Sequence, residues 1–404
     1  MYDRCSGFQE KALQQFDLIA RDAGLFSARW ARRIHRASRL PGFLGDVFIL
    51  NCHTLREPTE KAPILAFSHK KIHDLFTVVE LALARSFPMH GHTVIAQGGL
   101  FSGMYVYRDW VPLFFKRWPF RMFSEILSRF IGRKIESLLR GANCHPVYRR
   151  FRDVPSRKVY DSYVFSGKRI SGMTYDQFTE YTRNETQKSI EAVRTNIQDK
   201  NKSLVIFPEG KYQQSGAIGK LNAFLMSVAQ ESGHPLLTLS ITYDELCPDK
   251  RGRIDTFITV NRIENQDKLA KATTNSLQTN TAVTASNLLA LILLEAGTQT
   301  EISSMESNLE KMSHALPALA LPFDERLLDV NFRKDRIERM LAARKNWFKR
   351  SNNALKLVSS EMAKFQTSER TVNDLEWNKN NIQHAIPALM QILREPPAGN
   401  GSGQ

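Results

Sequence analysis

Six short apolar runs, separated by longer segments of helical periodicity, constrain the fold of this chain more than any other feature. The runs begin near residues 63, 93, 144, 203, 236 and 254. One of the segments between them carries Ile190, Val193 and Ile197 on a single helical face. Strands that alternate with helices favour an α/β domain in which a central mixed sheet has helices on both faces and ligands bind near the strand ends. We place this domain at residues 45–264.

A histidine and an aspartate follow the first apolar run. We place residues 63–67 on a buried strand, His69 in the loop after it and Asp74 in the first turn of the next helix. Side chains five residues apart on an ideal helix point roughly 140° away from each other, so a regular helix cannot align the pair. His73 is nearer to Asp74 in sequence, but adjacent residues direct their side chains apart. The spacing therefore predicts that His69 and Asp74 pair across a strand-to-helix junction.

A histidine paired with a carboxylate is suited to removing a proton from a hydroxyl group. An unperturbed imidazole, with a pKa of ~6.5, is largely neutral at cellular pH and accepts a proton. A carboxylate on its other ring nitrogen fixes the tautomer and stabilises the imidazolium ion that forms. His69 and Asp74 are therefore candidate catalytic residues.

Four segments, in order along the chain, resemble the sequence blocks of the glycerolipid acyltransferase superfamily. His69 and Asp74 match its His-x4-Asp motif, and Phe207-Pro208-Glu209-Gly210 matches its Phe-Pro-Glu-Gly motif. Residues 141–149, a glycine followed by a short extended run that ends in arginine, resemble the second block. Residues 233–241 resemble the fourth block, a strand that opens with proline. The resemblance covers about residues 45–262 and implies a glycerol-3-phosphate acyltransferase-like fold.

The resemblance also implies an O-acyltransferase of phospholipid biosynthesis. Such an enzyme moves a fatty acyl group from acyl-CoA or acyl-carrier protein to a hydroxyl of lysophosphatidate or glycerol 3-phosphate, with His69 as general base and Asp74 orienting it. Neither a metal nor a cofactor beyond the acyl donor is implied. In this family the arginine of the second block contacts the acceptor phosphate, which makes Arg149 a candidate substrate-binding residue. Arg150 and Arg152 lie near enough to share that role, and a solvated basic cluster is the alternative.

The third block supplies further candidate substrate-binding residues. The resemblance assigns Glu209 to the acceptor, whereas its carboxylate could instead tie the turn to neighbouring amides. Gly210 suits a position where the backbone approaches a ligand closely or takes a positive φ angle. Many family members continue the motif with Thr-Arg, but this chain has Lys211 and Tyr212. Because Lys211 offers a point charge without the bidentate fork of arginine, a non-phosphorylated acceptor stays an alternative, as does a non-catalytic lipid-binding scaffold.

The charge of the chain favours a partner with a negative surface. Lysine and arginine outnumber aspartate and glutamate by 56 to 41, which gives a net charge of +15. Anionic membranes and nucleic acids both attract basic residues, but no nucleic-acid-binding motif is recognisable. The longest apolar run, residues 288–294, is far shorter than the ~20 residues of a transmembrane helix and predicts a core helix. Since the N-terminus lacks a signal peptide, we expect a cytoplasmic protein, peripheral on the cytoplasmic face of a membrane.

Two stretches combine aromatic and basic side chains. In residues 105–123, tyrosine, tryptophan and phenylalanine alternate with arginine and lysine. This composition is typical of a membrane interface, although a core helix with snorkelling arginines or the lining of an acyl tunnel would look alike. Residues 18–36, within an N-terminal amphipathic helical segment at 1–44, either lie on the bilayer too or pack on the catalytic domain.

The remaining regions carry weaker patterns. Residues 151–182 form a polar insertion that we interpret as a mobile flap. After residue 265 the strand pattern stops, and residues 265–395 predict a C-terminal helical region. Within it, apolar and basic residues alternate between 327 and 345, which predicts an amphipathic helix with a solvated basic face. Residues 396–404, rich in proline and glycine, predict a disordered tail.

Overall fold

The computed structural model of the protein describes residues 3–4, 44–57, 59–71, 74, 77–78, 81, 92–101, 119–141, 143–148, 154–162, 172–210, 213–264, 268–351, 354–358 and 372–395. The expectations for residues 1–44 and for the tail at 396–404 fall almost entirely outside these residues.

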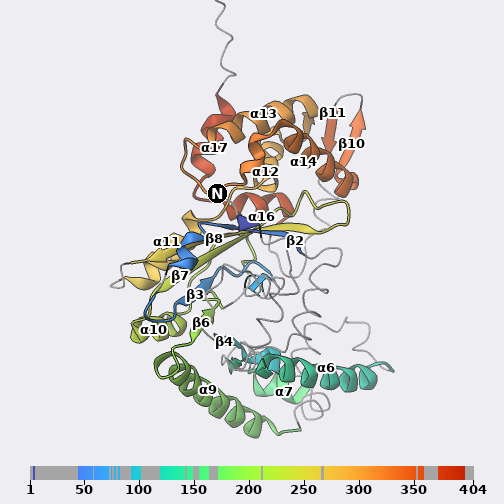
Figure 1. Ribbon diagram of the computed structural model, residues 1–404. Coiled ribbons are helices and arrows are strands. Elements are labelled where there is room, and N and C mark those ends of the chain that lie inside the picture. The colour runs from blue at the N-terminus through green and yellow to red at the C-terminus, as the bar shows by residue number, and fades with distance from the viewer. Residues whose placement is uncertain are drawn as a thin grey trace, which may run out of the picture.

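A mixed β-sheet forms the centre of the molecule (Figure 1). Its strands are β1 (Asp3–Arg4), β2 (Leu44–Leu50), β3 (Ile64–Phe67), β4 (His92–Gln97), β5 (Cys144–Val147), β6 (Ser203–Ile206), β7 (Leu236–Tyr243) and β8 (Ile254–Ile263). They lie in the order β1-β2-β8-β7-β3-β6-β4-β5. The β7–β8 and β1–β2 pairs are antiparallel and the others are parallel. The six strands expected from the sequence, and the α/β fold class with a mixed sheet, are confirmed.

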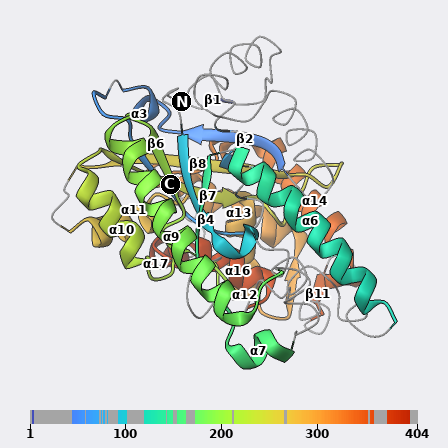
Figure 2. The same cartoon turned by 90° about the horizontal axis from the view of Figure 1, so that it is seen from below.

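Helices cover both faces of this sheet because successive strand residues point to opposite sides. Ile64 and Ala66 of β3 pack in one core with residues of α9 (Tyr175–Gln198), α10 (Ala223–Ser232) and α11 (Leu269–Thr279). Leu65 and Phe67 pack in another, with Leu55 of the short helix α3 (His53–Arg56) and with Leu81. Figure 2 shows α9 and α6 (Arg121–Gly141) as the two long helices at the end of the sheet that carries β4.

The polar insertion predicted at residues 151–182 is shorter than expected. Thr174 caps the N-terminus of α9 in a capping box with Gln177, so helix begins at Tyr175. A short helix, α7 (Arg157–Ser162), lies within the stretch as well, and Tyr160 and Phe178 stack on each other. Residues 157–162 and 175–182 of this stretch are therefore helical, and its role as a mobile flap stays a prediction.

The C-terminal region has its own apolar core at the opposite end of the sheet, next to β8 and β2 (Figure 1). It contains α12 (Ala285–Ala296), α13 (Ile302–Ala315), α14 (Val330–Ala343), α16 (Asp374–Asn381) and α17 (Ile386–Arg394). The run at residues 288–294 lies in α12 and is buried almost throughout, as predicted. A small sheet of β9 (Gln299–Glu301), β10 (Phe348–Ser351) and β11 (Ala354–Leu357) was not expected.

The solvated basic face predicted for α14 is wrong at two positions. Arg333 and Arg336 are each only 4% exposed. Arg333 donates to the carbonyl oxygens of Leu327 and Leu328. Arg336 reaches the carboxylates of Asp244 and Asp255, at 3.4 and 3.5 Å. Helical periodicity could not reveal this, because these two carboxylates belong to the β7–β8 hairpin of the central sheet.

Candidate active site

The candidate catalytic pair lies just beyond the carboxyl end of β3. The strand end is fixed to β7, because Ser68 donates its N–H to the Leu239 carbonyl and accepts the Ile241 N–H at its hydroxyl oxygen. His69 follows in the loop, and Asp74 is helical. Nδ1 of His69 lies 2.8 Å from Oδ2 of Asp74. The structure thus brings the two side chains together across a strand-to-helix junction as the spacing predicted, while their catalytic roles stay predictions.

Burial and hydrogen bonds hold Asp74 in one orientation. Its side chain is fully buried, whereas that of His69 is 20% exposed. Oδ2 also accepts the Lys71 N–H at 2.9 Å, and Oδ1 accepts the Tyr243 hydroxyl at 2.6 Å. Burial, and then the neighbouring Asp74 charge, raise the pKa of Tyr243 well above its ordinary value, which keeps the phenol a donor. With Asp74 on Nδ1, the chemistry of imidazole leaves Nε2 as the proton acceptor.

Tyr243 is a functional candidate that the sequence reasoning missed. It stands at the end of β7 within the strand that resembles the fourth block, and it is buried. The ammonium of Lys71 lies 4.1 Å from the centre of its ring and 3.5 Å from the Glu245 carboxylate. The available signal was weak: a tyrosine closing an otherwise apolar strand shows a polar tip but not its partner.

The Phe-Pro-Glu-Gly turn follows β6, which is the parallel neighbour of β3 in the sheet. The turn therefore lies next to the catalytic pair. The Phe207 ring lies 4.6 Å from the His69 ring, centre to centre. Gly210 takes a φ of 61°, the left-handed conformation expected of this glycine. Its N–H donates to the Phe207 carbonyl oxygen and closes the turn.

Glu209 ties this turn to the loop that carries His69. Its Oε1 accepts the His69 N–H at 2.9 Å and the Gln213 side-chain amide at 2.7 Å, and its Oε2 accepts the Gly219 N–H at 3.2 Å. Gln213 in turn donates its own N–H to the His69 carbonyl oxygen. Glu209 is 6% exposed, and burial raises its pKa. These contacts are those of the second role considered for Glu209, tying the turn to neighbouring amides; acceptor binding stays a prediction.

A buried lysine lies under the same loop. Lys70 is 3% exposed, and its ammonium donates to the Gly216 carbonyl oxygen at 3.3 Å. Burial lowers its pKa to about 8, although the charges of Glu209 and Asp74 oppose the shift. The sequence reasoning passed over Lys70 because nothing in the local pattern marks a lysine as buried.

Helix α16 of the C-terminal region supports the loop at residues 213–219 from the other side. The Trp377 indole N–H donates to the Gln213 carbonyl oxygen at 3.0 Å, and the Asn380 side-chain amide donates to the Ser215 carbonyl oxygen at 2.9 Å. Gly216 has a φ of 87°, and a side chain on it would meet the Trp377 carbonyl oxygen at 2.3 Å. The loop therefore needs glycine at this point to lie against α16.

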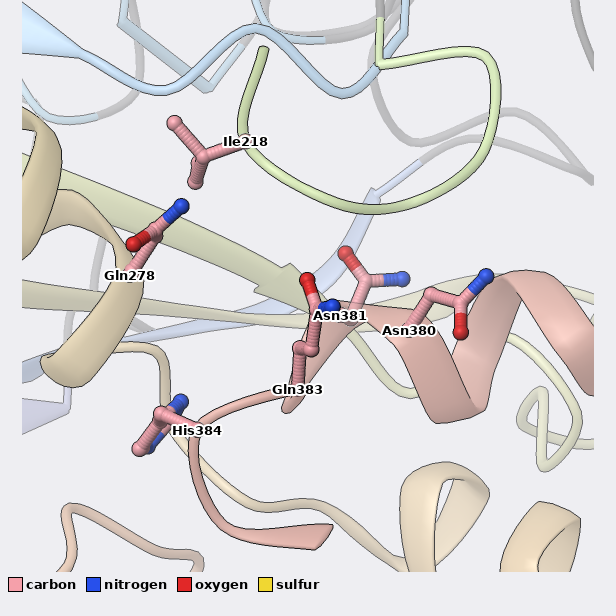
Figure 3. Close-up of a pocket in the computed structure, with 6 residues that line it drawn as sticks. All are labelled: Ile218, Gln278, Asn380, Asn381, Gln383 and His384. Atoms are coloured by element: carbon pink, nitrogen blue, oxygen red, sulfur yellow. The ribbon is translucent and has the colours of Figure 1, made fainter.

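A cavity of about 270 Å³ lies between this loop, α11 and the end of α16 (Figure 3). Amide side chains and one imidazole dominate its lining, which consists of Ile218, Gln278, Asn380, Asn381, Gln383 and His384. Burial, and then the Lys70 charge, lower the pKa of His384 to about 4, so its imidazole is neutral. The lining contains neither His69 nor Asp74.

Two candidate substrate-binding residues, Arg149 and Lys211, lie outside the described residues, as do Arg150 and Arg152. The described residues stop at Tyr148, directly after β5, and resume at Val154; they stop again at Gly210 and resume at Gln213. The extended run predicted before Arg149 is confirmed as β5. In the part of the chain that the structure describes, no helix has the length and apolar character needed to span a bilayer.

Comparisons with known proteins give little further identification. No protein-family model matches the sequence, and no curated protein matches it. A solved structure that matches is titled as that of the 1-acyl-sn-glycerophosphate (LPA) acyltransferase, PlsC, from Thermotoga maritima. The match covers 66% of this chain and 86% of that one, with 14% identity and a TM-score of 0.31. At this level of similarity, the fold rests on the strand order described above and the site on its own geometry.

Proposed function

We propose that this protein is an O-acyltransferase that moves a fatty acyl group from a thioester donor, acyl-CoA or acyl-carrier protein, to a hydroxyl of a glycerolipid precursor. The observation that carries the proposal is the 2.8 Å contact between His69 Nδ1 and Asp74 Oδ2 beside the Phe207–Gly210 turn. They are two of the four segments whose sequences resemble the acyltransferase superfamily, and they meet at adjacent strand ends.

His69 acts as the general base in this proposal. Its Nε2 takes the proton of the acceptor hydroxyl while the oxygen attacks the thioester carbonyl carbon. The tetrahedral oxyanion collapses, the carbon–sulfur bond breaks, and the imidazolium returns its proton to the departing thiolate. Asp74 stabilises the imidazolium from the Nδ1 side, and Tyr243 holds Asp74 in place.

The acceptor in this proposal carries a phosphate, as lysophosphatidate and glycerol 3-phosphate do. Arg149 and Lys211 are the proposed phosphate-binding residues, because each follows a strand on the carboxyl-end side of the sheet where His69 lies. Glu209 and Gly210 belong to the turn that contacts the loop of His69. A hydroxyl acceptor without phosphate would need neither cation.

A thiol-release assay tests the proposal. Purified protein is given acyl-CoA or acyl-carrier protein with glycerol 3-phosphate, lysophosphatidate or a non-phosphorylated alcohol, and acceptor-dependent thiol is measured. We expect turnover with a phosphorylated acceptor and a loss of about 10²–10⁴-fold in His69→Ala. Thiol release that needs no phosphate would shift the acceptor class, and wild-type turnover by His69→Ala would reject the base. A folded wild-type protein that releases no thiol with any acceptor would be a lipid-binding scaffold.

A further inference from the structure

Apolar side chains gather on the outside of one helix. Eight large apolar residues are strongly exposed in the described part of the chain, and six of them lie in or directly before the N-terminal half of α6. Those within the helix are Met122, Phe123, Ile126, Leu127 and Phe130, which are 43–67% exposed. Exposed apolar clusters of this kind mark surfaces that meet another apolar phase.

The two halves of α6 face the protein in different ways. In the C-terminal half, Ile135 and Leu139 pack with Phe101 and Cys144 at the β5 edge of the sheet. At about 100° per residue, Ser124 and Ser128 lie on the same side of the helix as Ile135, and both serines are buried. Ile126, nine residues before Ile135, lies on the opposite side. The N-terminal half thus turns polar residues inward and apolar residues outward.

Basic side chains lie on the same side of α6 as the exposed apolar residues, and their charge indicates the kind of partner that would bind there. Arg129, Arg133 and Lys134 are exposed, and the Lys134 ammonium lies 5.6 Å from the centre of the Phe130 ring. Two carboxylates lie on the same helix: Glu125 is 1% exposed and accepts from Arg121, and Glu136, whose side chain is 32% exposed, pairs with Arg140. The outer face of α6, which we define as its exposed apolar residues and these three cations, therefore carries a net positive charge.

We propose that the outer face of α6 docks the protein on a lipid bilayer that contains anionic lipid. A helix with one apolar face and flanking cations lies in the plane of the headgroups, where its rings enter the acyl boundary and its cations meet phosphates. A second copy of this chain fits less well, because a two-fold contact would bring the three cations against themselves. Helix α6 lies at the end of the sheet away from the C-terminal region (Figure 1).

Vesicle flotation tests this proposal without any turnover. The probe is vesicles of phosphatidylcholine with roughly a third phosphatidylglycerol, and vesicles of phosphatidylcholine alone are the comparison. The combined Phe123→Ser, Ile126→Ser and Phe130→Ser variant should lose at least about 10-fold in partitioning. The matched control is Leu328→Ser with Val330→Ser, two exposed apolar residues of the C-terminal region that should float like wild type.

Charge neutralisation is the second arm. Arg129→Gln, Arg133→Gln and Lys134→Gln together should reduce binding to the anionic vesicles at least about 10-fold and leave the small binding to neutral vesicles unchanged. Because all these side chains are exposed, circular dichroism should show wild-type melting. A Phe123→Trp variant, which keeps the apolar character, should bind and be quenched by brominated lipid.

Three results would overturn the docking surface. They are wild-type protein that does not float, a serine variant that floats like wild type, and a dimer that the serine variant dissociates while flotation is unaffected. His69→Ala should float like wild type, so that failure of the proposed chemistry and failure of the docking surface are told apart.

Discussion

Two buried carboxylate clusters, placed by consecutive residues of one strand end, differ in the partners they use. Tyr243 donates to Asp74, whose other oxygen faces the His69 imidazole. Asp244, the next residue, accepts from Ser286 and faces the Arg336 guanidinium, which also reaches Asp255. One cluster thus pairs its carboxylate with an imidazole, and the other pairs its carboxylates with a guanidinium, which is always charged.

The difference in partners suits the two clusters to different roles, the first to proton transfer and the second to holding two regions of the protein together. A buried carboxylate beside an imidazole can stabilise a charge that appears only when a proton is taken. A buried carboxylate beside a guanidinium has its compensating charge at all times, which suits a permanent contact between the central sheet and the C-terminal region. We therefore expect changes in the first cluster to affect turnover and changes in the second to affect folding.

The largest effect should come from Asp74→Asn. An amide cannot stabilise the imidazolium and does not fix the required tautomer, so kcat should fall by roughly 10²–10⁴-fold. Thiol release under saturating acceptor measures this. The melting temperature should change far less than the rate, and a variant with wild-type kcat would remove Asp74 from the mechanism.

Arg336→Met should be the most destabilising change in the other cluster. It leaves the carboxylates of Asp244 and Asp255 without this buried cation, at a cost of about 3–5 kcal/mol in the free energy of unfolding. Urea titration gives the value. Arg339→Met is the matched control on the same helix, because Arg339 pairs with the more exposed Asp335 and should cost less than about 1 kcal/mol. Equal losses in both variants would contradict the assembly role.

Lys70 is buried near Asp74 and Glu209, and its lowered pKa predicts that the stability of the protein depends on pH. Its pKa is about 8 in the folded protein against an ordinary value of 10.5. Between these two pH values the unfolded chain binds more protons at this residue than the folded chain, so the lysine contributes stability that rises with pH. From pH 8 to pH 10.5, wild type should gain up to about 3 kcal/mol over Lys70→Met in urea unfolding. Lys61→Met, at an exposed lysine, is the control; a flat difference for Lys70→Met would refute the burial effect.

The smallest expected effect is that of Trp377→Phe. Trp377 belongs to the C-terminal region and contacts the loop at residues 213–219 beside the candidate site. The change keeps an aromatic side chain but removes the five-membered ring of the indole, including the N–H that donates to Gln213. Loss of that hydrogen bond should cost about 1 kcal/mol in stability. Because Gln213 holds Glu209 and His69, kcat should fall severalfold while the acceptor KM stays the same. Trp347→Phe, in the core of the C-terminal region, should leave kcat unchanged. A change confined to KM would contradict a positioning role.

Local pattern predicted the strands and the pairing of His69 with Asp74, because both depend on residues close in sequence. A strand of apolar residues and a short loop place this pair whatever surrounds them. The pattern could not reveal Tyr243 as the second partner of Asp74, since the two residues are far apart in the chain and meet only when β7 lies next to β3.

The buried cations were missed for a related reason. Arg336 and Lys70 read as solvated residues in any local window, and only the folded sheet supplies the carboxylates and carbonyl oxygens that compensate them. The small sheet of β9, β10 and β11 escaped because its strands are three or four residues long and carry no clear alternation.

The contact of Trp377 and Asn380 with the loop at residues 213–219 has a consequence for engineering. A fragment that ends near residue 264 would keep every residue of the proposed chemistry, yet the loop that aligns Glu209 would lose its backing and Asp244 its counter-ion. Exchange of the C-terminal region with that of another protein would succeed only if the donor carried equivalents of α14 and α16 in register. The proposed catalytic site therefore depends on the C-terminal region as well as on the central sheet.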